Sequence, residues 1–122
     1  MYKIILSLLC ILGYSCTAPQ PDLVLSTNIY DFGILETNHI YQGAVIIKNA
    51  GKGVLKIKEV DPDCSCTDVS VTKKELSAGD TCLLKFVYNT HLKSGKYENY
   101  ICITANTDSL VHILQINSLV DL

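Results

Sequence analysis

Hydrophobic and polar residues alternate along most of the chain from residue 23 onward. In the run VLKIKEV, Leu55 and Ile57 fall on one face of an extended chain and Lys56 and Lys58 on the other, the period of two expected of a half-buried β-strand. Turn-forming residues separate seven such runs. They are LVLS (23–26), NIYDFG (28–33), IYQGAVIIKNAG (40–51), GVLKIKEV (53–60), DTCLLKFVYN (80–89), GKYENYICITAN (95–106) and LVHILQINSLV (110–120).

These runs predict an all-β domain. No stretch sustains the 3.6-residue apolar period of an amphipathic helix. The segments NAGKG (49–53), SAGD (77–80) and KSGK (93–96) are typical of hairpin turns. About seven short strands in roughly 100 residues favour an immunoglobulin-like antiparallel β-sandwich. We expect one domain, residues 23–122, with no internal repeat.

The first sixteen residues, MYKIILSLLCILGYSC, have the layout of a short signal peptide. Lys3 precedes an apolar run that is too short to span a bilayer as a helix, and small residues follow it. The segment LGYSC resembles the lipobox of bacterial lipoproteins, which are cut just before a cysteine that receives lipid. We therefore expect a signal peptide over residues 1–15, lipidation of Cys16, and a tether over residues 16–22 in which Pro19 and Pro21 disfavour helix.

Charge and cysteine content narrow the class of protein. The chain has 122 residues, 48% of them hydrophobic, with a formal net charge of −2 and no arginine. Bidentate recognition of phosphates and bases depends on arginine, so we expect no nucleic-acid partner. Removal of residues 1–15 leaves 107 residues, one domain in size, and also removes Cys10. Export to a bacterial cell envelope, with the domain on the periplasmic side, permits disulfides among the remaining cysteines.

Five segments of the chain form a recognisable series: YDFG (30–33), VIIKNAGKGVLKIKEVDPDCSCT (45–67), AGDTCLLKFVYNT (78–90), KSGKYENYICITAN (93–106) and LQINSLV (114–120). Together they resemble a bacterial family known as domain of unknown function 1573 (DUF1573), which is immunoglobulin-like and related to the ASPM-SPD2-Hydin type. The most specific marks are Asn49, Gly51 and the Cys-x-Cys-Thr that starts 13 residues after Gly51. Ser65 departs from the family pattern, which usually has glycine there. The resemblance implies a fold and an envelope location, but no activity.

The pair Cys64 and Cys66 leaves four interpretations open. Residues i and i+2 of a strand lie about 6.6 Å apart on one side, whereas disulfide Cα atoms are roughly 5.5–6 Å apart. A local disulfide therefore requires a bend, which Pro62 could begin. The thiols could also be small packing residues, or half of a copper or zinc site. A bridge to Cys82 or Cys102 is the fourth interpretation.

Other candidate chemistry is weaker. Cys82 is in phase with core-facing positions and Cys102 is out of phase, so we expect a buried free thiol at Cys82 and no 82–102 bridge. No histidine lies within twenty residues of Cys66 to serve as a base. The three histidines have no metal-ligand spacing, and the three aspartates near the cysteines lack the pattern of a calcium loop. These residues are His39, His91 and His112, and Asp61, Asp63 and Asp68.

We expect a non-enzymatic envelope protein with no cofactor and no small-molecule substrate. Its partners would be the membrane, through the lipid at Cys16, and another envelope protein, which could pair with an edge strand. The alternative is a lipoprotein that handles metal or thiol redox chemistry through Cys64 and Cys66.

Overall fold

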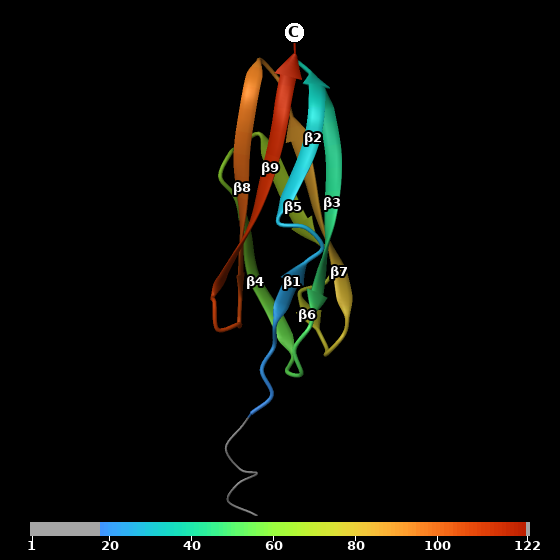
Figure 1. The fold of residues 1–122 in the computed structure, drawn as a ribbon, viewed down its shortest axis with the longest axis vertical. Coiled ribbons are helices and arrows are strands. Elements are labelled where there is room, and N and C mark those ends of the chain that lie inside the picture. The colour runs from blue at the N-terminus through green and yellow to red at the C-terminus, as the bar shows by residue number, and fades with distance from the viewer. Residues whose placement is uncertain (1–17, 122) are drawn as a thin grey trace, which may run out of the picture.

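The computed structural model describes residues 18–121, which form two packed β-sheets (Figure 1). All seven predicted runs are strands, and two short strands were missed by the sequence pattern, β5 and β6. The strands are β1 (Leu23–Leu25), β2 (Ile29–Glu36), β3 (Ile40–Asn49), β4 (Leu55–Pro62), β5 (Thr67–Val71), β6 (Glu75–Leu76), β7 (Thr81–Asn89), β8 (Gly95–Ala105) and β9 (Val111–Asp121). No helix in this part of the chain has the length and apolarity of a membrane span.

The two sheets have the orders β1-β3-β7-β5 and β2-β9-β8-β4-β6. Adjacent strands are antiparallel, as predicted, except that β2 and β9 are parallel. The chain passes from one sheet to the other between β1 and β2. We call the end where the chain enters β1 the base, and the opposite end, where β9 finishes, the distal end (Figure 1).

The predicted hairpins at residues 49–53, 77–80 and 93–96 are wrong. These segments do reverse the chain, but they connect β3 to β4, β6 to β7 and β7 to β8, and each of these pairs is divided between the two sheets. Within residues 18–121, β8 and β9 are the consecutive strands that pair with each other. The turn residues therefore predicted correctly where the chain reverses, but they did not predict which strands pair.

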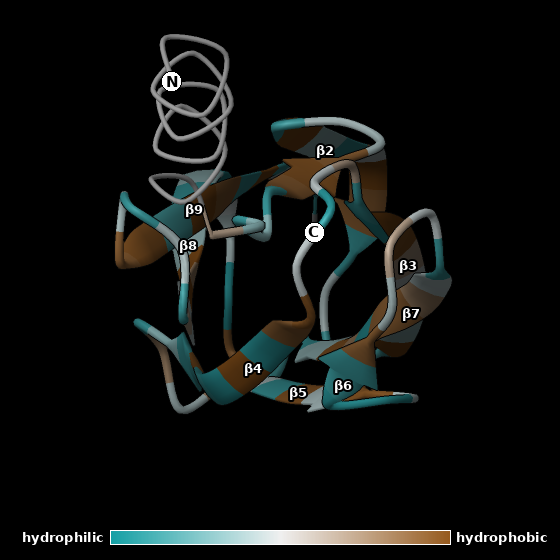
Figure 2. Cartoon of the chain, turned by 90° about the horizontal axis from the view of Figure 1, so that it is seen from below, coloured by the Kyte–Doolittle hydropathy of each residue, from teal (hydrophilic) through white to brown (hydrophobic). Residues whose placement is uncertain are grey.

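The core lies between the sheets, and its residues follow the predicted alternation. Figure 2 shows hydrophobic and hydrophilic residues alternating along the strands. Leu55 is fully buried and Ile57 is 4% exposed, which confirms the predicted inward face of β4. A second, distal cluster surrounds Tyr88, whose ring stacks on Phe32 with 5.7 Å between the centroids.

A buried amide at the base joins four segments of the chain. The Asn49 side chain is fully buried at the end of β3. Its Oδ1 accepts from the N–H groups of Asp22 (3.2 Å) and Gly51 (3.0 Å). Its Nδ2 donates to the carbonyl groups of Gly53 (2.8 Å) and Leu76 (2.9 Å). One side chain thus links the N-terminal segment, the 50–53 loop and β6 to β3.

We expect Asn49→Ala to lower the free energy of unfolding by about 3–5 kcal/mol, because it leaves several buried polar groups without partners. The measurement is urea denaturation. The matched control is Asn106→Ala, since the Asn106 side chain also bonds two backbone groups, Lys56 N–H (2.7 Å) and Val54 C=O (3.0 Å), but in an exposed setting. The control is expected to cost about 1 kcal/mol or less. Equal losses in the two variants would contradict the role given to Asn49.

Candidate functional site

The structure joins Cys64 and Cys66 in a disulfide, one of the four interpretations that the sequence left open. The sulfur atoms are 2.04 Å apart and the Cα atoms 5.1 Å apart. The pair lies in the segment that crosses from β4 to β5 at the distal end. A tight turn bends the chain here, because Thr67 N–H donates to Cys64 C=O at 3.1 Å. Both cysteines are half-buried, and Cys66 packs against the distal cluster.

The metal-handling alternative finds no support in residues 18–121, where no group of three or more His, Cys, Asp or Glu side chains could hold an ion. His39 lies 3.3 Å from Glu36. The Nε2 atom of His112 lies 2.7 Å from Thr107 Oγ1, and partial burial lowers the pKa of the His112 imidazole. His91 is exposed on the loop after β7. The histidines are thus distributed over both ends of the domain.

The other two cysteines of the described chain are free, and they lie as predicted. Cys82 faces the core and is 5% exposed, and burial raises the pKa of its thiol above the ordinary value. Cys102 is half-exposed on the outer face of the five-stranded sheet, opposite the exposed Ile113 of β9. The 82–102 bridge that the sequence disfavoured is not formed.

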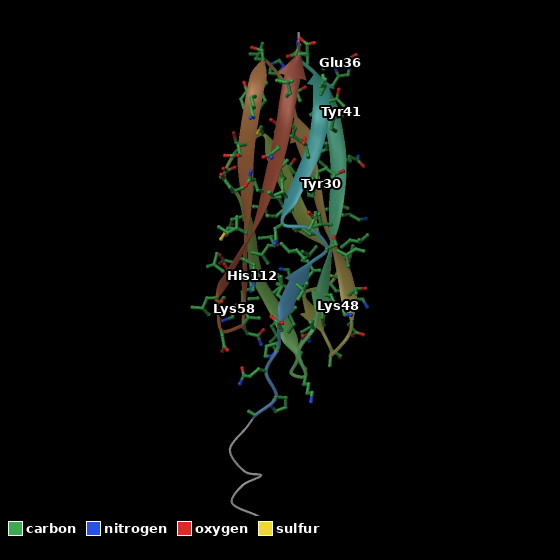
Figure 3. The ribbon with its side chains drawn as sticks, viewed as in Figure 1. Tyr30, Glu36, Tyr41, Lys48, Lys58 and His112 are labelled. Carbon is green, nitrogen blue, oxygen red and sulfur yellow. A yellow bond between two sulfur atoms is a disulfide. The ribbon has the colours of Figure 1, made fainter. Side chains whose placement is uncertain are left out.

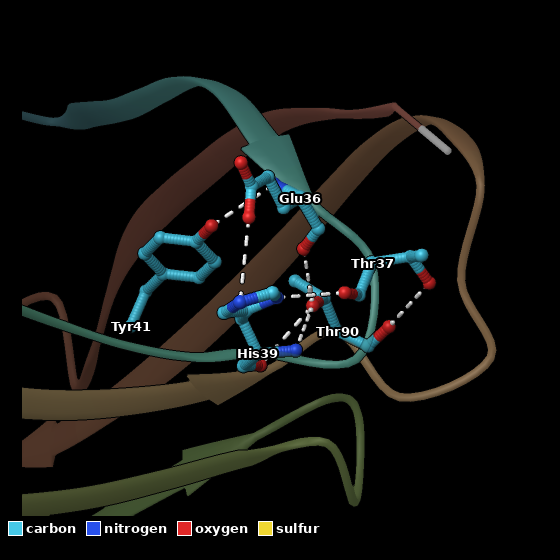
Figure 4. Close-up of polar contacts among 5 residues, drawn as sticks. All are labelled: Glu36, Thr37, His39, Tyr41 and Thr90. Atoms are coloured by element: carbon cyan, nitrogen blue, oxygen red, sulfur yellow. Dashed lines mark hydrogen bonds and ion pairs between the residues drawn. The ribbon is translucent and has the colours of Figure 1, made fainter.

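A chain of hydrogen bonds closes the distal end (Figure 4). The fully buried Thr90 accepts from His39 N–H at 2.9 Å and has its hydroxyl 2.7 Å from the carbonyl oxygen of Glu36. Thr37 Oγ1 lies 3.3 Å from Thr90 C=O. Tyr41 OH accepts from Glu36 N–H at 2.9 Å and so links β3 to β2. These contacts are structural, and they close the gap between β2 and the free part of β3.

The outer edge of β5 is open. Unpaired edge groups also remain on β3 before residue 46, which β1 does not reach, and on β4 beyond its two pairs with β6. Asn89 N–H donates to Cys66 C=O, and Thr72 N–H donates to Leu83 C=O. Because antiparallel pairs alternate, Asp68 and Ser70 form the bonds to β7, and the N–H and C=O groups of Val69 and Val71 point away from the sheet. Among the described residues, these outward groups have no backbone partner.

The other edges carry features that discourage strand pairing. β1 has three residues and β6 has two. β2 has an irregular register between Asp31 and Ile34, where Gly33 adopts φ = 75°. β4 ends at Pro62, which has no N–H to offer at a position that faces outward. β5 has the sequence TDVSV, with no proline, no glycine and three β-branched residues.

A shallow groove of about 640 Å³ extends from β5 across the outer face of the four-stranded sheet. Its floor is formed by the backbone of Gly43 and the small side chain of Ala44 from β3. A Cβ at Gly43 would point to the core side of the sheet, where it would lie 2.4 Å from the Phe86 ring. Asp68 and Lys85 supply its charged groups. The groove gives the side chains of a segment bound at β5 a surface to contact.

Thiol titration of the domain, purified from residue 17 onward, tests the cysteine assignments. We expect one thiol, Cys102, to react in the folded protein and a second, Cys82, only on unfolding, because burial hinders access and disfavours its thiolate. Two more thiols, from Cys64 and Cys66, are expected only after reduction. Cys102→Ser is the control that removes the fast reaction. Rapid reaction of Cys64 and Cys66 without reductant would disprove the disulfide.

Solved structures with a similar fold are distant in sequence. A protein of unknown function from Porphyromonas gingivalis W83 matches with a TM-score of 0.74 at 18% identity, over 86% of this chain and 50% of that one. The Vibrio cholerae VesB protease matches with a TM-score of 0.63 at 13% identity, over 84% of this chain and 32% of that one. The ASH/PapD-like domain 7 of human CEP192 matches with a TM-score of 0.66 at 11% identity, over 88% of this chain and 91% of that one.

These likenesses show an immunoglobulin-like sandwich of PapD type and nothing about activity. The chain spans about half the length of the Porphyromonas protein. No curated protein matches the sequence. The model of a family described as "protein of unknown function (DUF1573)" matches residues 23–120, nearly the whole described domain. The chain therefore belongs to the DUF1573 family, as the cysteine and glycine motifs indicated.

Proposed function

We propose that this protein is a non-catalytic domain of the bacterial cell envelope, anchored by lipid at Cys16, that binds another protein by adding a strand to β5. The observation that carries the proposal is the open edge of β5. The signal peptide, Cys16 and the lipid lie outside the described residues, so the anchor rests on the segment LGYSC.

The geometry at β5 suits strand addition. An extended peptide would receive hydrogen bonds from the N–H groups of Val69 and Val71 and donate to their carbonyl groups. Side chains that point to the outer face would then lie beside Asp68 and Ser70, at the rim of the groove. Backbone pairing would provide affinity, and the groove would select among side chains.

Thiol redox chemistry at Cys64–Cys66 is the second candidate. The observation that favours it is a disulfide between half-buried cysteines in a surface turn. The Cys64→Ser/Cys66→Ser double variant separates the candidates, because it abolishes redox exchange and leaves the β5 pairing with β7 in place.

The strand-addition proposal predicts that Val69→Pro abolishes capture of the envelope partner. Proline removes an outward N–H and places its ring in the path of an added strand, yet breaks no bond to β7. We expect at least about a tenfold loss of affinity. The control is Val60→Pro. Val60 is also half-buried, and its N–H also points away from its sheet, but it lies on β4 of the other sheet. The measurement is crosslinking and affinity capture from envelope extracts with each variant. Equal capture by the wild type and both variants would exclude β5.

The anchor is tested separately with Cys16→Ala. Loss of the acyl chains is expected to move the protein from the membrane to the soluble fraction, because the chains provide the membrane affinity. Fractionation and the mass of the mature protein measure this. Cys102→Ser serves as the control, and an unchanged membrane fraction of Cys16→Ala would exclude the lipid anchor.

A further inference from the structure

The N-terminal segment is bound to the base of the domain. Gln20 C=O accepts from the N–H groups of Lys52 (2.9 Å) and Gly53 (3.0 Å), and Asp22 C=O accepts from Ala50 N–H (3.0 Å). Figure 1 shows this segment leaving the fold at the base, at the opposite end from the C-terminus. We call residues 19–22 the strap.

The loop under the strap has no room for side chains. A Cβ at Gly51 would lie 2.3 Å from the carbonyl oxygen of Gln20, and a Cβ at Gly53 would lie 2.6 Å from that of Pro19. Real Cβ contacts of this kind would force the backbones apart. The two glycines are therefore required by the strap, and this gives a physical reason for the NAGKG segment that the sequence suggested was a hairpin.

We propose that the strap holds the sandwich end-on against an anionic lipid surface, with the 50–53 loop next to the headgroups. This inference rests on the proposed lipid at Cys16. Only three residues, 17–19, lie between Cys16 and Gln20, so the span between their Cα atoms covers four Cα–Cα steps and is at most about 14 Å. A domain bound by its strap cannot move farther from the bilayer than this short segment allows.

The distribution of charge favours the same orientation. The half of the domain near the base has six lysines and five acidic residues, whereas the distal half has three lysines and seven acidic residues. Figure 3 shows Lys48 and Lys58 toward the base and Glu36 at the distal end. The basal residues are Lys48, Lys52, Lys56, Lys58, Lys73, Lys74, Asp22, Glu59, Glu75, Asp80 and Asp108. The distal residues are Lys85, Lys93, Lys96, Asp31, Glu36, Asp61, Asp63, Asp68, Glu98 and Asp121. An anionic surface repels the distal half more strongly than the base.

The test places a fluorescent amino acid at Ala50, in the basal loop, or at Ser94, in the distal loop before β8. The mature chain carries Cys102→Ser and is coupled through Cys16 to a maleimide phospholipid in vesicles that contain phosphatidylglycerol and a headgroup quencher. The two probes are separated along the strands by roughly 30 Å. We expect strong quenching of the probe at Ala50 and little quenching of the probe at Ser94. Equal quenching at both positions would overturn the proposal.

Two further comparisons test the strap and the lipid. Ten Gly/Ser residues inserted between Thr17 and Ala18 leave the fold intact and add roughly 17 Å of reach, so quenching at Ala50 is expected to fall. Gly51→Ala is expected to give the same fall by displacing the strap. Unchanged quenching in the insertion variant would overturn the role of the strap. An unchanged contrast between the probes on neutral vesicles would overturn the assignment to anionic lipid.

Because the protein is coupled to lipid chemically, failure of the proposed orientation can be distinguished from failure of the proposed lipid anchor. The quenching reports orientation whether or not cells acylate Cys16, and the Cys16→Ala fractionation reports acylation whether or not the domain stands end-on.

Discussion

The base of this domain depends on one buried amide. Asn49 ends β3 at the point where the chain leaves one sheet for the other, and the crossing loop exposes backbone groups that no β-ladder satisfies. Its side chain can accept two hydrogen bonds and donate two, and in the structure Oδ1 accepts two and Nδ2 donates two. An apolar side chain of similar size would leave these groups desolvated and unpaired. The position of the strap, the path of the 50–53 loop and the docking of β6 all follow from this arrangement.

The sequence predicted the strands and core residues that follow from the two-residue alternation, and it missed the features that depend on pairing between distant strands. Leu55 and Ile57 could be assigned to the core because alternation reports burial directly. The segment at 49–53 looked like a hairpin because its glycines and asparagine are turn residues, but those residues report a change of direction and not the sheet that the next strand joins. The parallel pairing of β2 with β9 joins the two ends of the domain, and no local pattern encodes it. β5 and β6 were missed because five and two residues are too few for a period to show.

The candidate site was predictable only in part. The Cys64–Cys66 pair was visible in the sequence, but its bridge depends on the turn that Thr67 closes with Cys64, and that turn cannot be read from residue types. A disulfide across three residues restricts the unfolded chain little, by less than about 2 kcal/mol in the chain-entropy model. Its effect is therefore local: it fixes the crossing that delivers the chain to β5. The open edge itself could not be foreseen, since β5 had not been recognised as a strand.

The open edge and the strap are compatible for a geometric reason. β5 forms the edge of the four-stranded sheet on one side of the sandwich, and it runs from the β4–β5 crossing toward the base. A partner strand would need access along that whole side. A domain free to tilt on a long tether would at times lie against the bilayer on one side or another, and the acidic distal half would not prevent contact through the middle of a sheet. A domain held by its base keeps all of its sides exposed to the surrounding compartment. With the proposed anchor in place, the short bound strap would keep the β5 edge accessible to another chain, whereas proline, irregular register and short length discourage pairing at the other edges.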